Sequence, residues 1–442
     1  MNTQKSDHEM VKGILLLYHR CSIERDAAAV TEHIEAFSRH SRFRVWSVNT
    51  EEGFPAGLGL LRFDVIILHY SLFAGWCYFL NQQFEDYLTV SSSSYKIAFF
   101  QDEYRYCRKR FDFVNQHKVD CSYTLVKPEY FKDTYRKYTV VTKLVCTIPG
   151  YVSDSLIDSA KRLYKPDPDR TIDVGYRGRQ LEFFMGKGGQ EKSAIASGFL
   201  DRAGKLKLKL DITCTEAKRL YGKDWYSFLA GCKAFLGVET GVSIFDTEDV
   251  VREECERILA ANPTTTFDEI FEQVLAPWEN KIYYRTIGPR HFEAAAFRVC
   301  QILFEGEYSG VLQPMVHYIS LKKDFSNFDN VIQLLSDRAI REELTENAYR
   351  DLIASGRYSY ARFIDGIDKE LEEQGFKAGA LSNEDRVSDL LALGSWSRKV
   401  KTSVWNARYY GNLLPVPLRK LLRPISRRLL HGNTDAGRSG TS

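Results

Sequence analysis

The stretch RHFEAAAFRVCQILFEGEYSG, residues 290–310, places a carboxylate, Glu293, in an alanine-rich apolar segment. A carboxylate next to so many buried side chains is costly unless it reaches solvent or a polar partner. Two interpretations are open. In the first turn of a helix, the charge would simply favour the helix dipole. At a helix end that faces a cleft, its two oxygens could instead accept hydrogen bonds from the two hydroxyls of a ribose.

A second segment, DVGYRGRQLEFFMGKGGQEKSAI at residues 173–195, combines glycines with basic side chains. Backbone N–H groups in a glycine turn and at a helix N-terminus can donate to phosphate oxygens, and basic side chains neutralise the phosphate charge. The segment suits a diphosphate, although it matches neither common glycine-rich nucleotide motif and a turn with solvated charges would look the same. The candidate binding residues are Arg177, Gly178, Arg179, Lys187 and Lys192.

Other polar residues stand at the ends of predicted strands. Glu239 and Gly241 follow the apolar run CKAFLGV, and ligands of open parallel sheets bind beyond the carboxyl ends of the strands. His69 ends FDVIILH, and Asp102 and Glu103 end KIAFFQDE, where a general base could deprotonate an acceptor hydroxyl. Simpler roles also fit: a loop glutamate, a structural histidine and helix-capping carboxylates.

Outside these segments the sequence offers few further candidates for binding a metal or a phosphate. His317, in QPMVHYISL, could face the donor phosphates or sit in a turn. The acidic pair Asp167 and Asp169 flanks a proline in a linker, which argues against a metal-binding DxD motif. Nine scattered cysteines show no CxxC or Cys/His spacing, so we expect reduced, mostly packed thiols and no zinc site. No metal is predicted.

The first 165 residues alternate strand and helix patterns. Continuous apolar strands between amphipathic helices, such as that at 26–40, indicate a parallel α/β sheet covered on both faces. The predicted strands cover residues 11–19, 43–49, 63–71, 96–103, 121–126 and 141–150.

The alternation restarts after YKPDPDR, residues 164–170, where two prolines among charges suggest a domain boundary. Strands are predicted at 171–179, 206–213 and 232–240, an insertion of helix and loop at 246–282, and a helix closing the second unit at 357–375. We therefore predict two Rossmann-like α/β domains facing each other across a cleft. Their predicted limits are 1–165 and 166–375, followed by a basic helical tail at 376–442.

The tail carries the basic character of the chain. Nine Lys and Arg and no acidic residue lie between 398 and 428, so the first 397 residues of this +3 chain carry −6. A general nucleic-acid binder would carry positive charge on the fold itself.

Residues 413–430 interleave leucines with cations and three prolines, which is typical of attachment to an anionic membrane surface or of docking onto the protein's own acidic body. No early apolar run is long enough for a signal or a span. We expect a cytoplasmic protein that can sit on the inner membrane face.

The chain resembles the C-terminal half of GT-B glycosyltransferases. The resemblance is carried by three motifs that occur in the same order, GRQL…GKGGQEK, FLGVETG and RHFEAAA. They are most similar to the bacterial family 1/family 4-like group that includes the spore-maturation-protein-like enzymes, over residues 173–365. The resemblance implies that Glu293 binds the nucleotide ribose and that Arg179 and Lys192 bind the diphosphate, with Arg290 and Gly241 inside the matching motifs. It also implies a paired glutamate eight residues before Glu293, where Arg285 stands instead.

The predicted function is transfer of a sugar from a nucleotide-sugar donor to a glycan or lipid-linked acceptor in bacterial surface polysaccharide synthesis. No cofactor is expected, and the donor base is left open. Glu239 could be the displaced first glutamate of the family's pair. Two alternatives stand beside this prediction: a sugar-nucleotide epimerase of the same fold, and a non-catalytic binding or scaffold protein, which the missing glutamate pair would favour.

Overall fold

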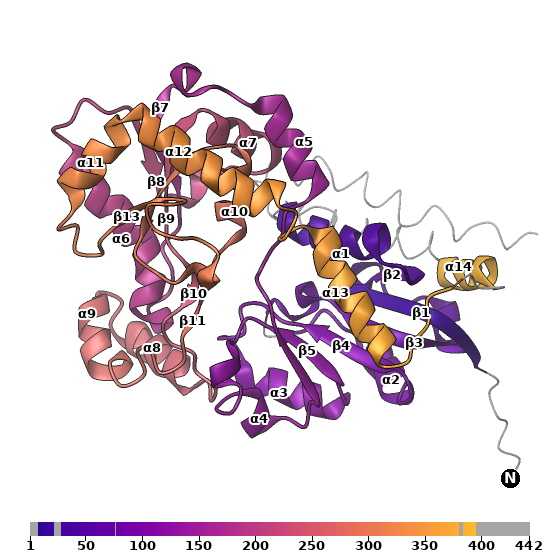
Figure 1. Ribbon diagram of the computed structural model, residues 1–442. Coiled ribbons are helices and arrows are strands. Elements are labelled where there is room, and N and C mark those ends of the chain that lie inside the picture. The colour runs from indigo at the N-terminus through magenta and orange to yellow at the C-terminus, as the bar shows by residue number, and fades with distance from the viewer. Residues whose placement is uncertain (1–7, 22–27, 76, 380–382, 395–442) are drawn as a thin grey trace, which may run out of the picture.

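The computed structural model describes residues 8–21, 28–75, 77–379 and 383–394. It contains two parallel β-sheets, each covered by helices, with the first sheet and the second sheet in separate lobes (Figure 1). The first sheet has the strand order β2-β1-β3-β4-β5-β6, and every adjacent pair is parallel. Its strands are β1 (Glu9–Tyr18), β2 (Val45–Asn49), β3 (Leu61–Leu68), β4 (Tyr95–Phe99), β5 (Cys121–Thr124) and β6 (Lys143–Cys146).

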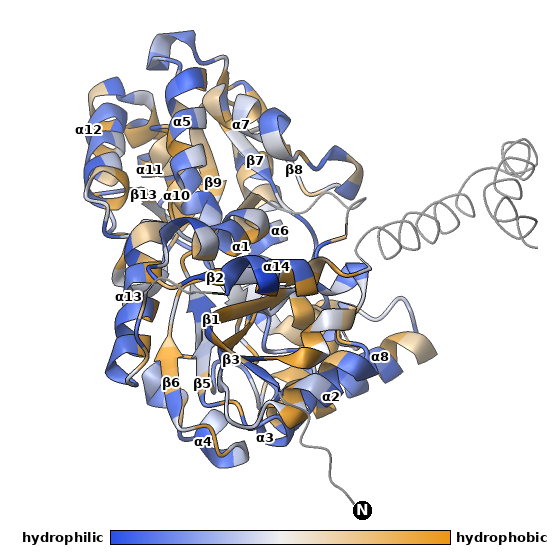
Figure 2. Cartoon of the chain, turned by 90° about the vertical axis from the view of Figure 1, so that its right-hand side faces the viewer, coloured by the Kyte–Doolittle hydropathy of each residue, from blue (hydrophilic) through white to orange (hydrophobic). Residues whose placement is uncertain are grey.

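The central strands β1 and β3 are nearly continuous apolar runs because helices cover both of their faces, as their hydrophobic colour indicates (Figure 2). One face packs against α1 (Ala28–His40) and α13 (Tyr360–Glu373). The other packs against α2 (Gln82–Val90), α3 (Cys107–Gln116) and α14 (Glu384–Ala392). The short α4 (Tyr135–Tyr138) lies just before β6 in the chain.

The second sheet has the order β13-β12-β9-β7-β8 and is also wholly parallel. Its strands are β7 (Ile172–Arg177), β8 (Leu210–Thr213), β9 (Cys232–Gly237), β12 (Cys300–Phe304) and β13 (Ile319–Leu321). In each sheet the first strand in chain order lies in the interior of the sheet. The second strand pairs with it on one side, and the third strand pairs with it on the other side. The strand order therefore reverses between β1 and β3 in the first sheet and between β7 and β9 in the second, as in doubly wound folds. The predicted pair of Rossmann-like α/β domains is confirmed.

One apolar core joins the second sheet to six helices. Asp337 stands directly before the last of these helices, and its side chain accepts from the N–H groups of Ala339 and Ile340. The six are α5 (Asp154–Leu163), α6 (Gly186–Ala203), α7 (Gly222–Ala230), α10 (Pro289–Ala296), α11 (Phe328–Ser336) and α12 (Arg338–Ala348).

Two helices are exchanged between the domains, which differs from the predicted limits. Helix α5 lies before the boundary at 165, yet it packs against α7 and α10 of the second domain. Helix α13 was expected to close the second unit, yet its residues Tyr360, Ile364 and Leu371 join the core of the first sheet beside α1. Apolar periodicity marks the buried face of a helix but not the sheet that buries it, so the sequence pattern could not separate these cases.

The predicted insertion at 246–282 forms α8 (Val250–Ala261), α9 (Phe267–Ile270) and a turn of π-helix, and a two-stranded antiparallel arm flanks it. The arm consists of β10 (Thr240–Val242) and β11 (Tyr284–Thr286). Val251, Cys255 and Tyr284 share a core with residues of the first domain, including Phe100 and Phe111. This core makes a second junction between the domains besides the chain crossings at α5 and α13.

Within the described ranges, no helix combines the length and apolar character needed to cross a bilayer. The basic stretch at 413–430 lies outside the residues that the structure describes. Of the predicted tail, the described part contains α14, which packs against the short helical turn Ala56–Leu60 of the first domain.

Buried histidines make the first domain sensitive to acid. His33 of α1 packs edge-on against His69 at 4.9 Å between ring centroids, and burial lowers the pKa of His33 to about 3. The pKa of a histidine in an unfolded chain is near 6.5. Between pH 6.5 and 3 the unfolded chain therefore binds a proton at His33 that the folded chain does not bind. The free energy of unfolding falls across this window as the pH drops. Going from pH 7 to pH 5 should cost about 2 kcal/mol from His33 alone. Chemical denaturation at the two pH values checks this, and His33→Phe should show a smaller acid loss.

Candidate functional site

A cavity of about 320 Å³ opens at the point where the strand order of the second sheet reverses. The ends of the adjacent strands β7 and β9 supply Tyr176, Gly178, Gly237 and Val238 to its wall. Crevices at such switch points, outside the carboxyl ends of the strands, are where doubly wound sheets bind ligands. Further parts of the wall come from α6, from the loop before α7, from α7, from the start of α10, from β12, and from Ala28 and Ala29 of the first domain. Both domains therefore build the cavity.

Three cationic side chains predicted to bind a nucleotide line this cavity: Arg179, Lys192 and Arg290. Arg179 is exposed just after β7, and no ion pair of its guanidinium is found among the described residues. Arg290 lies over the Trp225 ring, 4.9 Å from its centroid, and donates to the backbone oxygen of Arg177. The three positive charges converge on one opening, which favours an anionic ligand.

Lys192 connects the cavity to the first domain. The pKa of its ammonium is lowered to about 8, mainly by burial, with the Asp102 carboxylate opposing the shift and the nearby Arg179 and Arg290 adding to it. Asp102 follows β4 of the first domain, so its charge reaches across the cleft between the domains. Asp102 itself is exposed and has a positive φ of 50°. The predicted polar residue at this strand end is therefore near the predicted phosphate-binding lysine.

Glu293 lines the same cavity and is half-buried. It is the fifth residue of α10, which begins at Pro289, so the interpretation of a carboxylate in the first helical turn is wrong. Trp225 Nε1 donates to its Oε2 at 2.8 Å, and no described residue donates to Oε1. Burial raises the pKa of Glu293, and the Trp225 hydrogen bond and Arg290 oppose that rise. One carboxylate oxygen is held by tryptophan and the other is open to a ligand.

Other candidates from the glycine-rich segment lie away from the cavity. Arg177 is buried, pairs with Asp211 at 2.8 Å and stacks on Phe228. Lys187 lies over the Phe271 ring at 4.2 Å. Neither side chain lines the cavity, because Arg177 is turned toward the edge strand β8 and Lys187 toward the insertion.

The N-terminus of α6 is also occupied, contrary to the predicted phosphate site there. The backbone N–H of Gly188 donates to Ser243 Oγ at 2.7 Å, and that of Lys187 donates to the Glu279 carboxylate at 3.2 Å. Ser243, which follows β10, and Glu279 of the insertion thus satisfy two of the donors that a helix start leaves open. Gly186 has a φ of 72°, and a side chain there would collide with these same two groups.

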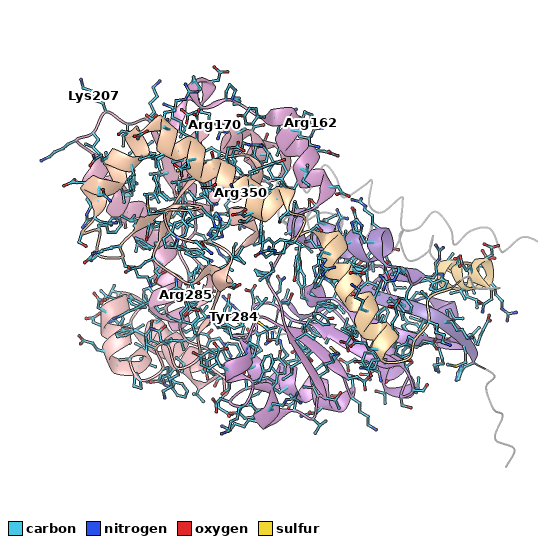
Figure 3. The ribbon with its side chains drawn as sticks, viewed as in Figure 1. Arg162, Arg170, Lys207, Tyr284, Arg285 and Arg350 are labelled. Atoms are coloured by element: carbon cyan, nitrogen blue, oxygen red, sulfur yellow. The ribbon has the colours of Figure 1, made fainter. Side chains whose placement is uncertain are left out.

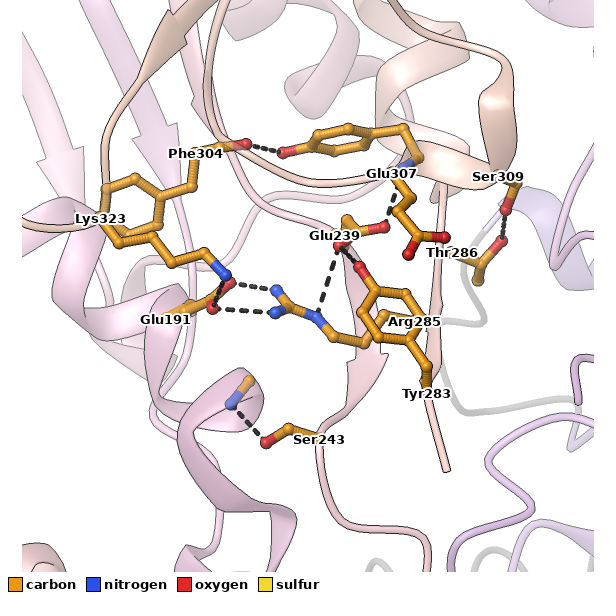
Figure 4. Close-up of polar contacts among 12 residues, drawn as sticks. Glu191, Glu239, Ser243, Tyr283, Arg285, Thr286, Phe304, Glu307, Ser309 and Lys323 are labelled. Atoms are coloured by element: carbon orange, nitrogen blue, oxygen red, sulfur yellow. Dashed lines mark hydrogen bonds and ion pairs between the residues drawn. The ribbon is translucent and has the colours of Figure 1, made fainter. Parts of the chain in front are cut away.

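Glu239 and Arg285 belong to a buried ionic network (Figure 4). Arg285 forms two hydrogen bonds with Glu191 and lies 3.6 Å from Glu239. Glu239 also accepts from the Tyr308 backbone N–H at 2.8 Å and from the Tyr283 hydroxyl. The neighbouring Gly241, with a φ of 99°, passes close to the Tyr284 backbone. Glu239 thus points away from the cavity, and Arg285 is its partner rather than a substitute for a ligand-binding glutamate.

Three further candidates are structural. Glu103 is buried and accepts from Thr124, Leu125 and Tyr135 at 2.6–2.8 Å. His69 is fully buried, and its Nδ1 bonds with Ser71. His317 is buried between the Gln313 backbone and Asp351. His69 and Glu103 follow strands and His317 precedes β13, but the position along the chain does not fix the direction of a side chain, and none of the three lines the cavity.

Several cavity residues were missed from the sequence. They are Trp225, His291, Thr240 and Tyr221. Trp225 donates a hydrogen bond to Glu293, and His291 lies on the same helix, α10, as Glu293. Trp225 lies 68 positions before its partner, so only the folded chain reveals the pair. His291 could have been noticed because it stands two residues before Glu293 in the same motif.

No group of metal-ligating side chains is found within the described residues, and Asp167 of the DPD segment pairs with Arg341 at 2.7 Å. All nine cysteines are free. The cavity is therefore defined by cations, one carboxylate and aromatic rings.

No family model matches the chain, and no curated protein is similar to it. Among solved structures, the chain is similar to an alpha-glucosyltransferase in complex with UDP (12% identity, 81% of this chain and 98% of that one, TM-score 0.44). It is also similar to HepE of Anabaena in complex with UDP and glucose (11%, 83% and 100%, TM-score 0.46) and to a sucrose-phosphate synthase of Thermosynechococcus elongatus (13%, 84% and 100%, TM-score 0.44). At these identities and TM-scores the likenesses assign no activity, which is argued below from the site.

Proposed function

We propose that this protein is a nucleotide-sugar-dependent glycosyltransferase of the GT-B type. The observation that carries the proposal is the cavity at the switch point of the second sheet, where Arg179, Lys192, Arg290 and Glu293 converge. A nucleotide sugar has both chemical features that this set complements, namely a doubly charged diphosphate and a ribose with two neighbouring hydroxyls. The three cations suit the diphosphate, and the open oxygen of Glu293 suits a ribose hydroxyl.

In the proposed reaction, an acceptor hydroxyl attacks the anomeric carbon of the sugar. The bond from that carbon to the diphosphate oxygen breaks, and its electron pair leaves on the nucleoside diphosphate. Arg179, Lys192 and Arg290 stabilise the developing phosphate charge in a partly enclosed site, where fixed charges act strongly. Chemistry without a metal remains part of the proposal.

Asp102 is the group that we assign to accept the proton of the acceptor hydroxyl. It lies on the opposite side of the cleft from the nucleotide residues, it is exposed, and its charge acts on Lys192. The other predicted base, His69, is fully buried, and Glu103 is fully engaged. A base placed across the cleft from the leaving group fits direct displacement of the nucleotide.

Isothermal titration with UDP-, GDP- and dTDP-sugars tests the proposal. One of them should bind, and adding a suitable acceptor should give transfer to it. Absence of binding by all three would contradict the proposal. Conversion of the sugar without any acceptor would instead identify the epimerase alternative, because an epimerase needs no second substrate.

Lys192 and Lys187 make a matched pair for testing the placement of the diphosphate. Both stand in the segment GKGGQEK, yet only Lys192 lines the cavity. Lys192→Met should weaken nucleoside diphosphate binding about tenfold or more, because a hydrogen bond to a charged group contributes about 1.5–3 kcal/mol. Lys187→Met should leave it unchanged. Titration calorimetry measures both, and equal effects of the two substitutions would contradict the placement.

The pH dependence gives a second readout of the same lysine. Since the pKa of Lys192 is about 8, its ammonium loses its proton above that pH, and diphosphate affinity should then fall in the wild type. The Lys192→Met variant should lack this step, and Lys187→Met should retain it.

For the acceptor we propose a glycan or lipid-linked molecule in bacterial surface polysaccharide synthesis, with the protein in the cytoplasm and in contact with the inner membrane. The support is the composition of residues 413–430, whose cations are Arg419, Lys420, Arg423, Arg427 and Arg428. Each basic residue near an anionic surface contributes about 1 kcal/mol.

Replacing the five cations of 413–430 with glutamine should therefore reduce binding to phosphatidylglycerol vesicles more than a hundredfold in a sedimentation assay. Vesicles of phosphatidylcholine serve as the uncharged control. Equal binding of the wild type and the variant to the anionic vesicles would rule out this role for the segment.

A further inference from the structure

We propose that His291 binds the diphosphate of the nucleotide through a neutral imidazole, donating its Nε2–H to a phosphoryl oxygen. This inference rests on the proposed function, since it names a further ligand of the same site. Nothing in the sequence motifs distinguishes His291 from a packed ring; the contacts of its two ring nitrogens do.

The Nε2 atom of His291 is a buried polar atom without a hydrogen-bond partner among the described residues. The side chain is only 5% exposed, and it lines the cavity. Of the buried side chains with such an unpartnered atom, His291 is the one in the cavity wall within the described chain. Buried polar atoms nearly always have partners, so an unpartnered nitrogen at a cavity indicates that the partner comes from a ligand.

Gly237 leaves no side chain beside this nitrogen. A Cβ atom built on Gly237 would lie 3.4 Å from Nε2, so any side chain at this strand end would cover the imidazole edge. Gly237 ends β9, one of the two strands that flank the switch point. On its other side the ring packs edge-on against Tyr308, with 5.2 Å between the centroids. The ring is thus held with its Nε2 edge toward the nucleotide-binding end of the sheet.

The contacts of Nδ1 determine which nitrogen carries the proton. Nδ1 lies 3.0 Å from the Gly288 backbone nitrogen and 3.1 Å from the Gly288 backbone oxygen. The amide N–H of Gly288 can only donate, so its hydrogen bond requires a lone pair on Nδ1. We therefore assign Nδ1 as the acceptor, which puts the ring proton on Nε2. The pKa of His291 is lowered to about 4, mainly by burial, while the contact with the Gly288 backbone opposes the shift and Arg290 adds to it, so the ring is neutral at physiological pH.

A donor at this position favours a phosphoryl oxygen over other acceptors. His291 is the third residue of α10, where the unpaired N–H groups of the helix start carry partial positive charge. Arg290 precedes it, and Lys192 and Arg179 line the same cavity. Because the imidazole is neutral, it adds a hydrogen bond without adding another cation to a site that already holds three.

Two substitutions separate the roles of the ring nitrogens. In His291→Asn the side-chain oxygen can replace Nδ1 as the acceptor for Gly288, while the donor at Nε2 is lost. In His291→Gln the terminal amide can reach the Nε2 position and keep a donor there. The experiment titrates both variants and the wild type with UDP, GDP and dTDP, and with the corresponding nucleosides, by calorimetry and NMR.

The expected result is that His291→Asn binds the preferred diphosphate about tenfold or more weakly, with nucleoside affinity unchanged, whereas His291→Gln retains most of the diphosphate affinity. In ¹⁵N-histidine NMR of the wild type, the free protein should show the Nε2–H tautomer, and the diphosphate but not the nucleoside should shift that nitrogen.

Unchanged diphosphate affinity in His291→Asn would overturn the inference while leaving the proposed function intact. An equal loss for nucleoside and diphosphate, or an Nδ1–H tautomer in the free protein, would also overturn it. If the wild type binds none of the nucleotides, the proposed function fails and the inference fails with it. The NMR arm uses the wild type, so it decides the matter even if a variant does not fold.

Discussion

Arg285→Ala is expected to lower the free energy of unfolding by about 3–5 kcal/mol, because removing one member of a buried ion pair leaves its partner charged and uncompensated. Here two carboxylates lose the same cation: Glu191, which Arg285 holds through both terminal nitrogens, and Glu239, at 3.6 Å. Arg285 is 4% exposed and lies on β11, where the arm meets the second domain (Figure 3). The main effect of Arg285→Ala should therefore be on the free energy of unfolding.

Lys323→Ala is the matched control. Lys323 pairs with the same carboxylate, Glu191, at 3.0 Å, but its side chain is 44% exposed. Exposed pairs contribute about 0–1 kcal/mol, so this variant should be close to the wild type. Urea unfolding of both variants measures the difference. Equal stability of Arg285→Ala and the wild type would show that the network of Glu191, Arg285 and Glu239 is not closed as described.

Glu293→Gln is expected to weaken nucleotide binding about tenfold to a hundredfold while the fold is retained. The amide oxygen of glutamine can still accept from Trp225 Nε1, which leaves an NH₂ group where the open carboxylate oxygen was. A ribose hydroxyl then loses a charge-assisted acceptor, which contributes about 1.5–3 kcal/mol. Calorimetry with the preferred nucleoside diphosphate measures the loss.

A 2′,3′-dideoxynucleotide completes this test as a double-mutant cycle. The wild type should bind the dideoxy compound more weakly by a similar factor, and Glu293→Gln should bind both nucleotides alike. If the two losses simply add, Glu293 does not contact the ribose.

Much of the fold could be predicted from the sequence. Each strand predicted by a continuous apolar run is present, because strands covered on both faces must be apolar along their length. The exchange of α5 and α13 between the domains could not be predicted, since an amphipathic face does not say which sheet it covers. The junction formed by the insertion was also missed, and there the two domains share an apolar core.

The candidate site was predictable in part. Arg179, Lys192, Arg290 and Glu293 come together in one cavity wall, because Arg179 follows β7 and the other three lie in the first two turns of α6 and α10 at one sheet edge. Arg177 and Lys187 stand within a few residues of them and point elsewhere, since neighbouring side chains on a strand or helix face different directions. Glu239, His69 and Glu103 occupy suitable strand ends but use their polar atoms for internal hydrogen bonds. Side-chain direction was the information that the sequence lacked.

A crystal structure of the chain soaked with the tightest-binding sugar nucleotide tests the central claim most directly. The diphosphate is expected beside Arg179, Lys192 and the start of α10, and the ribose on the free oxygen of Glu293. A nucleotide bound elsewhere, or an empty cavity at a concentration that saturates the protein in solution, would contradict it.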